Sequence, residues 1–268
     1  MQTSELIKQL DAAFKMRETG DYVGALGEFE TLERLSVHPR DIAALRLFQA
    51  SCLTDMGRPE DALKRLSRVD RNKLIFSKQV DCEYERARIE RALGRTDKAL
   101  DIAEKALRAA GAAVDKDEVK VVYEGLRTLQ GILLAEAGRC EDAMPVLESV
   151  PTDDLGWAEA RVCLGDCKYK KKLYLEAIDC YLSIISSATK VHPFYREAAL
   201  RNIGFAYYDL RQYAKAVEYL TQVASAYDDA PDMKAELFSI LASSYSHLGM
   251  TQEAAKYSGF SRGTNSVQ

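Results

Sequence analysis

Hydrophobic and polar residues along this 268-residue chain follow a helical period in short segments, and the segments meet in a recurring phrase. The stretches GRPEDALKRL at 57–66, GRTDKALDIA at 94–103 and GRCEDAMPVL at 138–147 each place a glycine and a polar turn before an apolar helical pattern. One helix ends and another begins in this way. No stretch alternates apolar and polar residues as a strand does. The pattern predicts an all-helical chain.

The phrase occurs seven times when the copies are aligned on one alanine, with gaps of 37, 37, 44, 34, 39 and 38 residues. The aligned residues are Ala25, Ala62, Ala99, Ala143, Ala177, Ala216 and Ala254. Five positions earlier, five of the seven copies have glycine, and the other two have Lys172 and Arg211. Glycine adopts the left-handed conformation that ends helices, so this position is interpreted as a helix stop. The longest gap predicts longer helices around residues 111–118.

A second position supports the alignment without having been used to choose it. Twelve residues before each alanine, every copy has Ala or Gly: Ala13, Ala50, Ala87, Gly131, Gly165, Gly204 and Ala242. Small residues on two facing helices let the backbones approach closely. We therefore expect each copy to be a pair of tightly packed antiparallel helices.

The glycine, the two small positions and the following aromatic residue resemble the tetratricopeptide repeat, most clearly in CLGDCKYKKKLYLEAIDCYLSII and NIGFAYYDLRQYAKAVEYLTQVA. The resemblance implies a single right-handed superhelix, or solenoid, over residues 1–268. The expected repeats are about 3–36, 40–70, 77–111, 116–150, 154–188, 193–228 and 231–260, followed by a flexible tail at 261–268. Arg46, Gln49, Glu83 and Arg86 depart from the family by standing where bulky apolar residues are usual.

In that family the first helix of each repeat lines a concave groove that binds peptides or proteins. The positions that the resemblance assigns to this groove include Tyr84, Arg88, Arg91, Asp166, Tyr169, Arg201, Phe205 and Tyr208. Arginine and aromatic residues are enriched where proteins bind proteins. The alternative is that these side chains are only solvated or capping groups. The family's clamp of Lys, Asn and Arg for chaperone tails is not reproduced, so chaperone binding is not expected.

An apolar stripe of Ile7, Leu10 and Phe14 is expected on the groove side of the first helix, away from the second helix. At the other end, the last helix is expected to be short, from about Gln252 to Tyr257. Exposed apolar ends of this kind are unusual on a monomer. They favour an alternative function, a self-assembling homo-oligomeric array whose ends make the contact.

Composition and charge narrow the classes of function. A net charge of −4 opposes nucleic acid binding, and neither a signal peptide nor a membrane-length apolar run is present, so we expect a cytoplasmic protein. Cys163 and Cys167 have the most metal-like spacing of the six cysteines, but two further ligands for a zinc site are not found. The lysines of KYKKK at 168–172 are expected to be solvated at a turn. No phosphate-binding loop or nucleophile motif occurs. The sequence therefore predicts a protein-binding scaffold, with no cofactor and no enzymatic activity.

Overall fold

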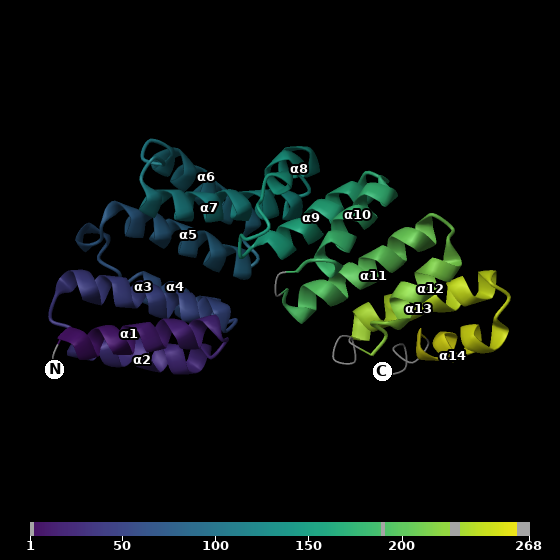
Figure 1. Cartoon of the computed structure of the whole chain (residues 1–268), viewed down its shortest axis with the longest axis horizontal. Coiled ribbons are helices and arrows are strands. Elements are labelled where there is room, and N and C mark those ends of the chain that lie inside the picture. The colour runs from purple at the N-terminus through teal and green to yellow at the C-terminus, as the bar shows by residue number, and fades with distance from the viewer. Residues whose placement is uncertain (1–2, 189–190, 226–230, 262–268) are drawn as a thin grey trace. The chain divides into compact units, whose positions relative to one another are not determined.

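The computed structural model describes residues 3–188, 191–225 and 231–261, and these residues form fourteen α-helices and one short 3-10 helix without a strand (Figure 1). They group into two compact units, Met1–Ala137 and Gly138–Gln268. The all-α prediction is confirmed, whereas the single continuous solenoid and its seven repeats stay predictions. No helix of the described ranges is long and apolar enough to cross a membrane.

The N-terminal unit contains α1 (Thr3–Glu18), α2 (Tyr22–Leu35), α3 (Pro39–Asp55), α4 (Pro59–Leu66), the 3-10 helix η1 (Arg71–Lys73), α5 (Phe76–Ala92), α6 (Thr96–Gly111) and α7 (Asp117–Glu136). The C-terminal unit contains α8 (Cys140–Glu148), α9 (Trp157–Lys170), α10 (Tyr174–Ile185), α11 (Pro193–Asp209), α12 (Tyr213–Thr221), α13 (Pro231–His247) and α14 (Thr251–Ser261). Within each unit, consecutive helices pack on one another. In addition, α5 contacts α3 and α7, and α11 contacts α9 and α13. The first helices of neighbouring pairs thus lie side by side and share one face of each unit.

All seven predicted helix stops adopt a positive φ. The glycines at this position have φ between 70° and 87°, and the two departures from glycine, Lys172 and Arg211, have φ of 62° and 58°. Residues with a Cβ adopt this conformation only at a cost, because the Cβ approaches the backbone carbonyl oxygen. The fold therefore imposes the turn even where the sequence does not supply the residue best suited to it.

Replacing Arg211 by glycine should therefore stabilise the C-terminal unit. Arg211 is exposed at a φ of 58°, so the change should raise the free energy of unfolding by roughly 0.5–1 kcal/mol. Gln212→Gly is the matched control because Gln212 has a φ of −91°, and this variant should gain nothing. Urea unfolding of both variants measures the difference, and equal effects would show that the positive φ carries no cost.

Close helix approach at the small positions packs two pairs of the C-terminal unit, α9 with α10 and α11 with α12. All seven aligned alanines are buried, six of them at 0% exposure. A Cβ added to Gly204 would lie 2.4 Å from Leu220 Cγ, and one added to Gly165 would lie 2.4 Å from the ring of Tyr181. Leu220 and Tyr181 belong to the partner helices and are themselves buried. The large residue of one helix thus occupies the space that the small residue of the other leaves.

Adding one methyl group at this contact should be costly. Gly204→Ala forces the buried Leu220 side chain to move, and overpacking of this kind lowers the free energy of unfolding by about 1–3 kcal/mol. Gly27→Ala in α2 is the control, because no atom lies within 4 Å of the added Cβ, and alanine should stabilise that helix by about 0.5–1 kcal/mol. Thermal midpoints that move in the same direction for both variants would contradict tight packing at Gly204.

Candidate functional site

The eight predicted groove residues all lie on first helices, but in two different units. Tyr84, Arg88 and Arg91 lie on α5 of the N-terminal unit, and the other five lie on α9 and α11 of the C-terminal unit. The chemistry of the two sets differs. Two of the three residues on α5 are arginines, whereas three of the five on α9 and α11 are aromatic.

Arg88 is held in an ion-pair network by carboxylates of its own unit. Its Nη2 lies 2.5 Å from Asp55 Oδ1 on α3, and its Nη1 lies 2.9 Å from Glu85 Oε2. The guanidinium carbon is 5.9 Å from the centroid of the Tyr84 ring. The side chains of Asp55 and Glu85 are only 12% and 4% exposed. Although burial opposes the charged form, these two carboxylates raise the pKa of Arg88 above its usual value.

The network continues in both directions along the first helices. Arg17 on α1 donates to Asp55 Oδ2 at 2.9 Å and to Ser51 Oγ at 2.7 Å. Beyond α5, Arg91 Nη2 lies 2.6 Å from Glu136 Oε1 on α7. Charges of alternating sign therefore link α1, α3 and α5, and a further pair links α5 to α7. Their main physical consequence is to hold the first helices of this unit together.

Removing the guanidinium of Arg88 should destabilise the protein. Arg88→Ala leaves Glu85 and one oxygen of Asp55 buried without their cation, which should lower the free energy of unfolding by about 3 kcal/mol. Arg58→Ala is the control, since the Arg58–Asp61 pair is exposed, with 52% and 41% of the side chains accessible, and such pairs contribute below about 1 kcal/mol. Equal losses in chemical unfolding would show that the Arg88 network does not stabilise the fold.

In the C-terminal unit, a hydrogen-bonded cluster joins α9, α10 and α11. Asp166 Oδ1 accepts from the Tyr181 hydroxyl at 2.6 Å and from Asn202 Nδ2 at 2.8 Å. Asn202 Oδ1 in turn accepts from Arg201 Nε at 3.0 Å. Burial raises the pKa of Asp166 above its usual value, although Tyr181, Arg201 and Asn202 act in the opposite direction. The cluster fixes the orientation of the Asn202 amide and the Arg201 guanidinium, both of which are half-buried.

Tyrosine rings follow the same face at the ends of the first helices. The Tyr169 hydroxyl donates to Asp209, and the Tyr208 hydroxyl shares a hydrogen bond with Ser243 Oγ at 2.9 Å. Each of these two rings also contacts the tyrosine five residues later, across the turn to the second helix: Tyr169 with Tyr174 at 5.3 Å and Tyr208 with Tyr213 at 5.7 Å between ring centroids. The Tyr213 ring stacks on His247 at 4.2 Å. Tyr169 and Tyr208 are thus half-buried rings, each positioned by a hydrogen bond of its hydroxyl and by contact with a second ring.

Sequence reasoning missed several members of this face. The three positions that the resemblance assigns to each first helix do not include Asp209, Tyr174, Tyr213 or His247, and Asn202 with Arg201 resembles only a fragment of the family's clamp. The Tyr-x-x-x-x-Tyr spacing, present at 169–174 and again at 208–213, is a signal that could have identified two of them. Phe205 differs from its neighbours, since it packs against the buried cluster of Leu220 and Leu237.

The orientation predicted for the apolar stripe of α1 is wrong. Phe14 contacts Phe29 on α2 at 5.4 Å and Phe48 on α3 at 4.9 Å between ring centroids. Leu10 packs against the same cluster, whereas Ile7 is 55% exposed. The apolar side chains of α1 thus pack toward α2 and α3. Two of the three residues predicted for self-association are therefore partly buried against the core of their own unit.

The predicted short helix at the C-terminal end is also corrected. The helix α14 extends to Ser261, four residues beyond the expected end. The Tyr257 ring lies 5.2 Å from Phe238 and 5.7 Å from Tyr245, both on α13. These rings fill the space between the last two helices. Residues 262–268, which include most of the expected flexible tail, lie outside the described residues.

The structure also locates the cysteine and lysine side chains that the sequence analysis considered. None of the six cysteines, all of which are described, forms a disulfide bond, and all except Cys163 are buried. No three His, Cys, Asp or Glu side chains of the described residues are grouped so that they could hold a metal ion. Lys168, expected to be solvated, is only 15% exposed and lies 3.1 Å from Glu148 and 3.4 Å from Glu176. It links α9 to the second helices on either side.

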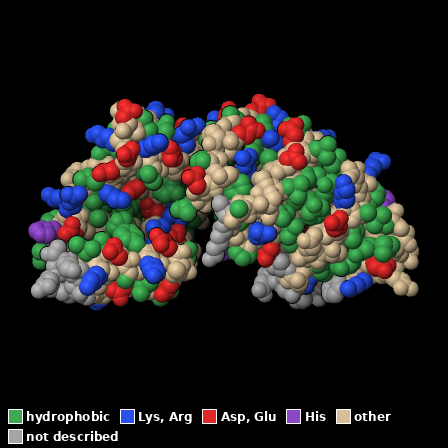
Figure 2. All heavy atoms as spheres, in the orientation of Figure 1, with side chains coloured by type: hydrophobic (Ala, Val, Ile, Leu, Met, Phe, Trp, Pro, Cys, Tyr) green, Lys and Arg blue, Asp and Glu red, His purple; other side chains and the backbone are tan. Residues whose placement is uncertain are grey.

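Surface chemistry also distinguishes the two units. Figure 2 shows hydrophobic side chains, with tyrosine counted among them, spread over the visible face of the C-terminal unit and interrupted by scattered charges. On the N-terminal unit in the same view, acidic and basic side chains alternate more densely. The half-buried tyrosines and amide therefore make the first-helix face of the C-terminal unit the stronger candidate site.

Comparison with known proteins places the fold. Residues 198–230 match the family model described as Tetratricopeptide repeat, and no protein with a curated description matches the chain. The apo form of the quorum sensor NprR from B. thuringiensis superposes with a TM-score of 0.70 and 16% identity, over 95% of this chain and 74% of that one. NprR in complex with its cognate peptide NprX gives 0.65 and 16%, over 94% and 76%. A tetratricopeptide repeat protein from Parabacteroides merdae gives 0.55 and 16%, over 98% and 95%. These likenesses confirm the predicted helical-repeat fold.

Proposed function

We propose that the chain, a tetratricopeptide-repeat protein, is a binding scaffold that holds a peptide or protein segment on the first-helix face of its C-terminal unit. The observation that carries this proposal is the set of half-buried tyrosines at 169 and 208, each positioned by a hydrogen bond and by a second ring. Rings held in this way lose little conformational freedom on binding, which favours affinity.

Asn202 adds polar recognition to the same face. A peptide backbone presents alternating N–H and C=O groups, and a side-chain amide can both donate to and accept from them. Asn202 is held between Asp166 and Arg201, so its orientation is set before a ligand arrives. NprR, whose fold this chain shares, has been crystallised with a peptide, which supports a peptide as the ligand class.

The N-terminal unit is proposed to contribute differently. The Arg88 guanidinium is engaged by Asp55 and Glu85, so using it for a partner would require breaking pairs that stabilise the unit. Binding without catalysis is the role that fits these groups. Peptide binding is favoured over self-association through α1, because Leu10 and Phe14 are partly buried against the buried cluster of their own unit.

Loss of a positioned ring should reduce affinity without unfolding the protein. Peptides selected on the full chain from a random display library should bind Tyr208→Ala at least about 30-fold more weakly, the equivalent of about 2 kcal/mol for an aromatic hot spot. Tyr219→Ala is the matched control, since Tyr219 lies on the second helix of the same pair and stacks on Tyr207. Fluorescence anisotropy measures both, with thermal midpoints as a check on folding.

The opposite pattern would contradict the proposal. If the selected peptides bind Tyr208→Ala and a Tyr169→Ala/Tyr208→Ala double variant as tightly as the wild type, the first-helix face is not the site. The same conclusion follows if only Tyr219→Ala weakens binding.

A further inference from the structure

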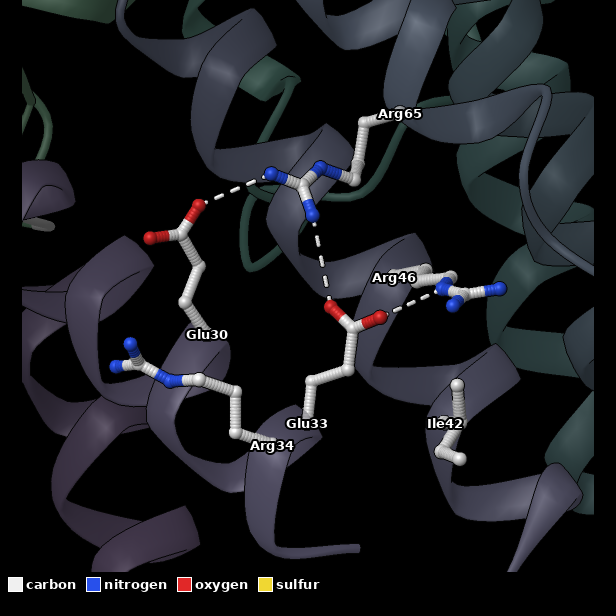
Figure 3. A pocket seen from close by; sticks show the side chains of 6 residues that line it. All are labelled: Glu30, Glu33, Arg34, Ile42, Arg46 and Arg65. Atoms are coloured by element: carbon white, nitrogen blue, oxygen red, sulfur yellow. Dashed lines mark hydrogen bonds and ion pairs between the residues drawn. The ribbon is translucent and has the colours of Figure 1, made fainter.

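A pocket of about 350 Å³ lies in the N-terminal unit between α2, α3 and α4. Figure 3 shows the residues that line it: Glu30, Glu33 and Arg34 from α2, Ile42 and Arg46 from α3, and Arg65 from α4. Its size is within the range of roughly 300–1,000 Å³ that is common for ligand sites. It is separate from the Arg88 network, because Arg46 pairs with α2 whereas Asp55 pairs with α1 and α5.

Glu33 is the fixed centre of the pocket. Its carboxylate lies 2.7 Å from Arg46 Nε and 3.5 Å from Arg65 Nη1, and it accepts from Gln49 Nε2 at 2.9 Å. These partners outweigh burial and hold the pKa of Glu33 below its usual value. Arg65 also pairs with Glu30 at 3.0 Å. The polar residues Arg46 and Gln49, which depart from the family pattern, thus form part of a preorganised charged wall.

The residues that line the pocket retain hydrogen-bond donors for a further anion. Three guanidinium groups face two carboxylates among the lining residues, which leaves one positive charge in excess. Among the described residues, the one hydrogen bond of the Arg34 guanidinium is to the neutral Thr31 hydroxyl, at 3.1 Å. Figure 3 shows this guanidinium turned away from Glu33. Arg34 is therefore the group whose charge the pocket does not neutralise.

The pocket also has an apolar side, which lies across Glu33 from the Arg34 guanidinium (Figure 3). Ile42 lines the pocket, and the short connection from α2 to α3 carries Leu35 and Val37, which are 48% and 82% exposed. These residues lie in the chain between the pocket residues Arg34 and Ile42. A ligand that satisfies both features has a single negative charge next to an aliphatic group. A phosphate dianion fits less well, because the carboxylates of Glu30 and Glu33 would repel its second charge.

We propose that this pocket binds a glutamate or aspartate side chain, with an aliphatic residue next to it, from a segment of a partner protein. The carboxylate pairs with Arg34, and the aliphatic side chain packs on Ile42. The site would add a second, charge-selective contact to a partner. It does not depend on the ligand proposed for the C-terminal unit.

Methyl NMR of the full chain tests this site with defined probes. The probe is the blocked peptide acetyl-Leu-Glu-Leu-Glu-amide, and its control has glutamine at both glutamate positions. The acidic peptide should shift the Ile42 methyl signal, assigned through Ile42→Val, in a saturable manner, and the glutamine peptide should not. Raising the salt concentration should weaken the effect, since the pair is exposed to solvent.

Two variants separate a specific site from a general charge effect. Arg34→Gln should weaken the acidic peptide about ten-fold, whereas Arg40→Gln, which removes a nearby exposed arginine that does not line the pocket, should leave affinity unchanged. Equal shifts with both peptides, equal effects of both variants, or shifts confined to α9 and α11 would overturn the proposal. Because Tyr208→Ala should not alter the Ile42 signal, failure here is distinguishable from failure of the C-terminal site.

Discussion

Close contact between a small residue on one helix and a large residue on its partner is the constraint on which the structure depends. At Gly204 the space for a single Cβ is already occupied by Leu220, and at Gly165 it is occupied by the Tyr181 ring. The two helices of each of these pairs are consecutive and joined by only a few residues, so they pack antiparallel and need a tight turn between them. The left-handed residue at that turn follows from the packing, which explains why Lys172 and Arg211 adopt it although they have a Cβ.

This constraint also decides where function can lie. The small residues lie where the two helices of a pair face each other. The other positions of the first helices, which lie side by side, form a common surface. In the N-terminal unit that surface carries mutually paired charges, such as Arg17, Asp55 and Arg88, which lock neighbouring helices. In the C-terminal unit the first helices carry Tyr169 and Tyr208, and the amide of Asn202 lies between the side chains of Asp166 and Arg201. We propose that the same architecture stabilises the N-terminal unit and leaves the C-terminal unit suited to binding.

Features that depend on the spacing of residues could be predicted from the sequence, whereas contacts that depend on the reach of individual side chains could not. The aligned alanines, the helix stops and the long helices α6 and α7 around residues 111–118 all follow from the repeat period, and the structure has each of them. The position of Phe14 does not follow, because successive helix positions differ by about 100° and a phenylalanine ring can bridge that step. The pairing of Arg88 with Asp55 and of Arg46 with Glu33 joins residues from different helices. A period within one helix cannot show that such charges meet.

The most direct test of the division between the two units is hydrogen–deuterium exchange on the full chain with and without a bound, selected peptide. The account predicts slower exchange in α9, α11 and α13, where the positioned tyrosines and Asn202 lie, and no change in α5. Protection of α5 with none in the C-terminal unit would show that the partner displaces the Arg88 ion pairs, and would contradict the assignment of binding to the tyrosine face.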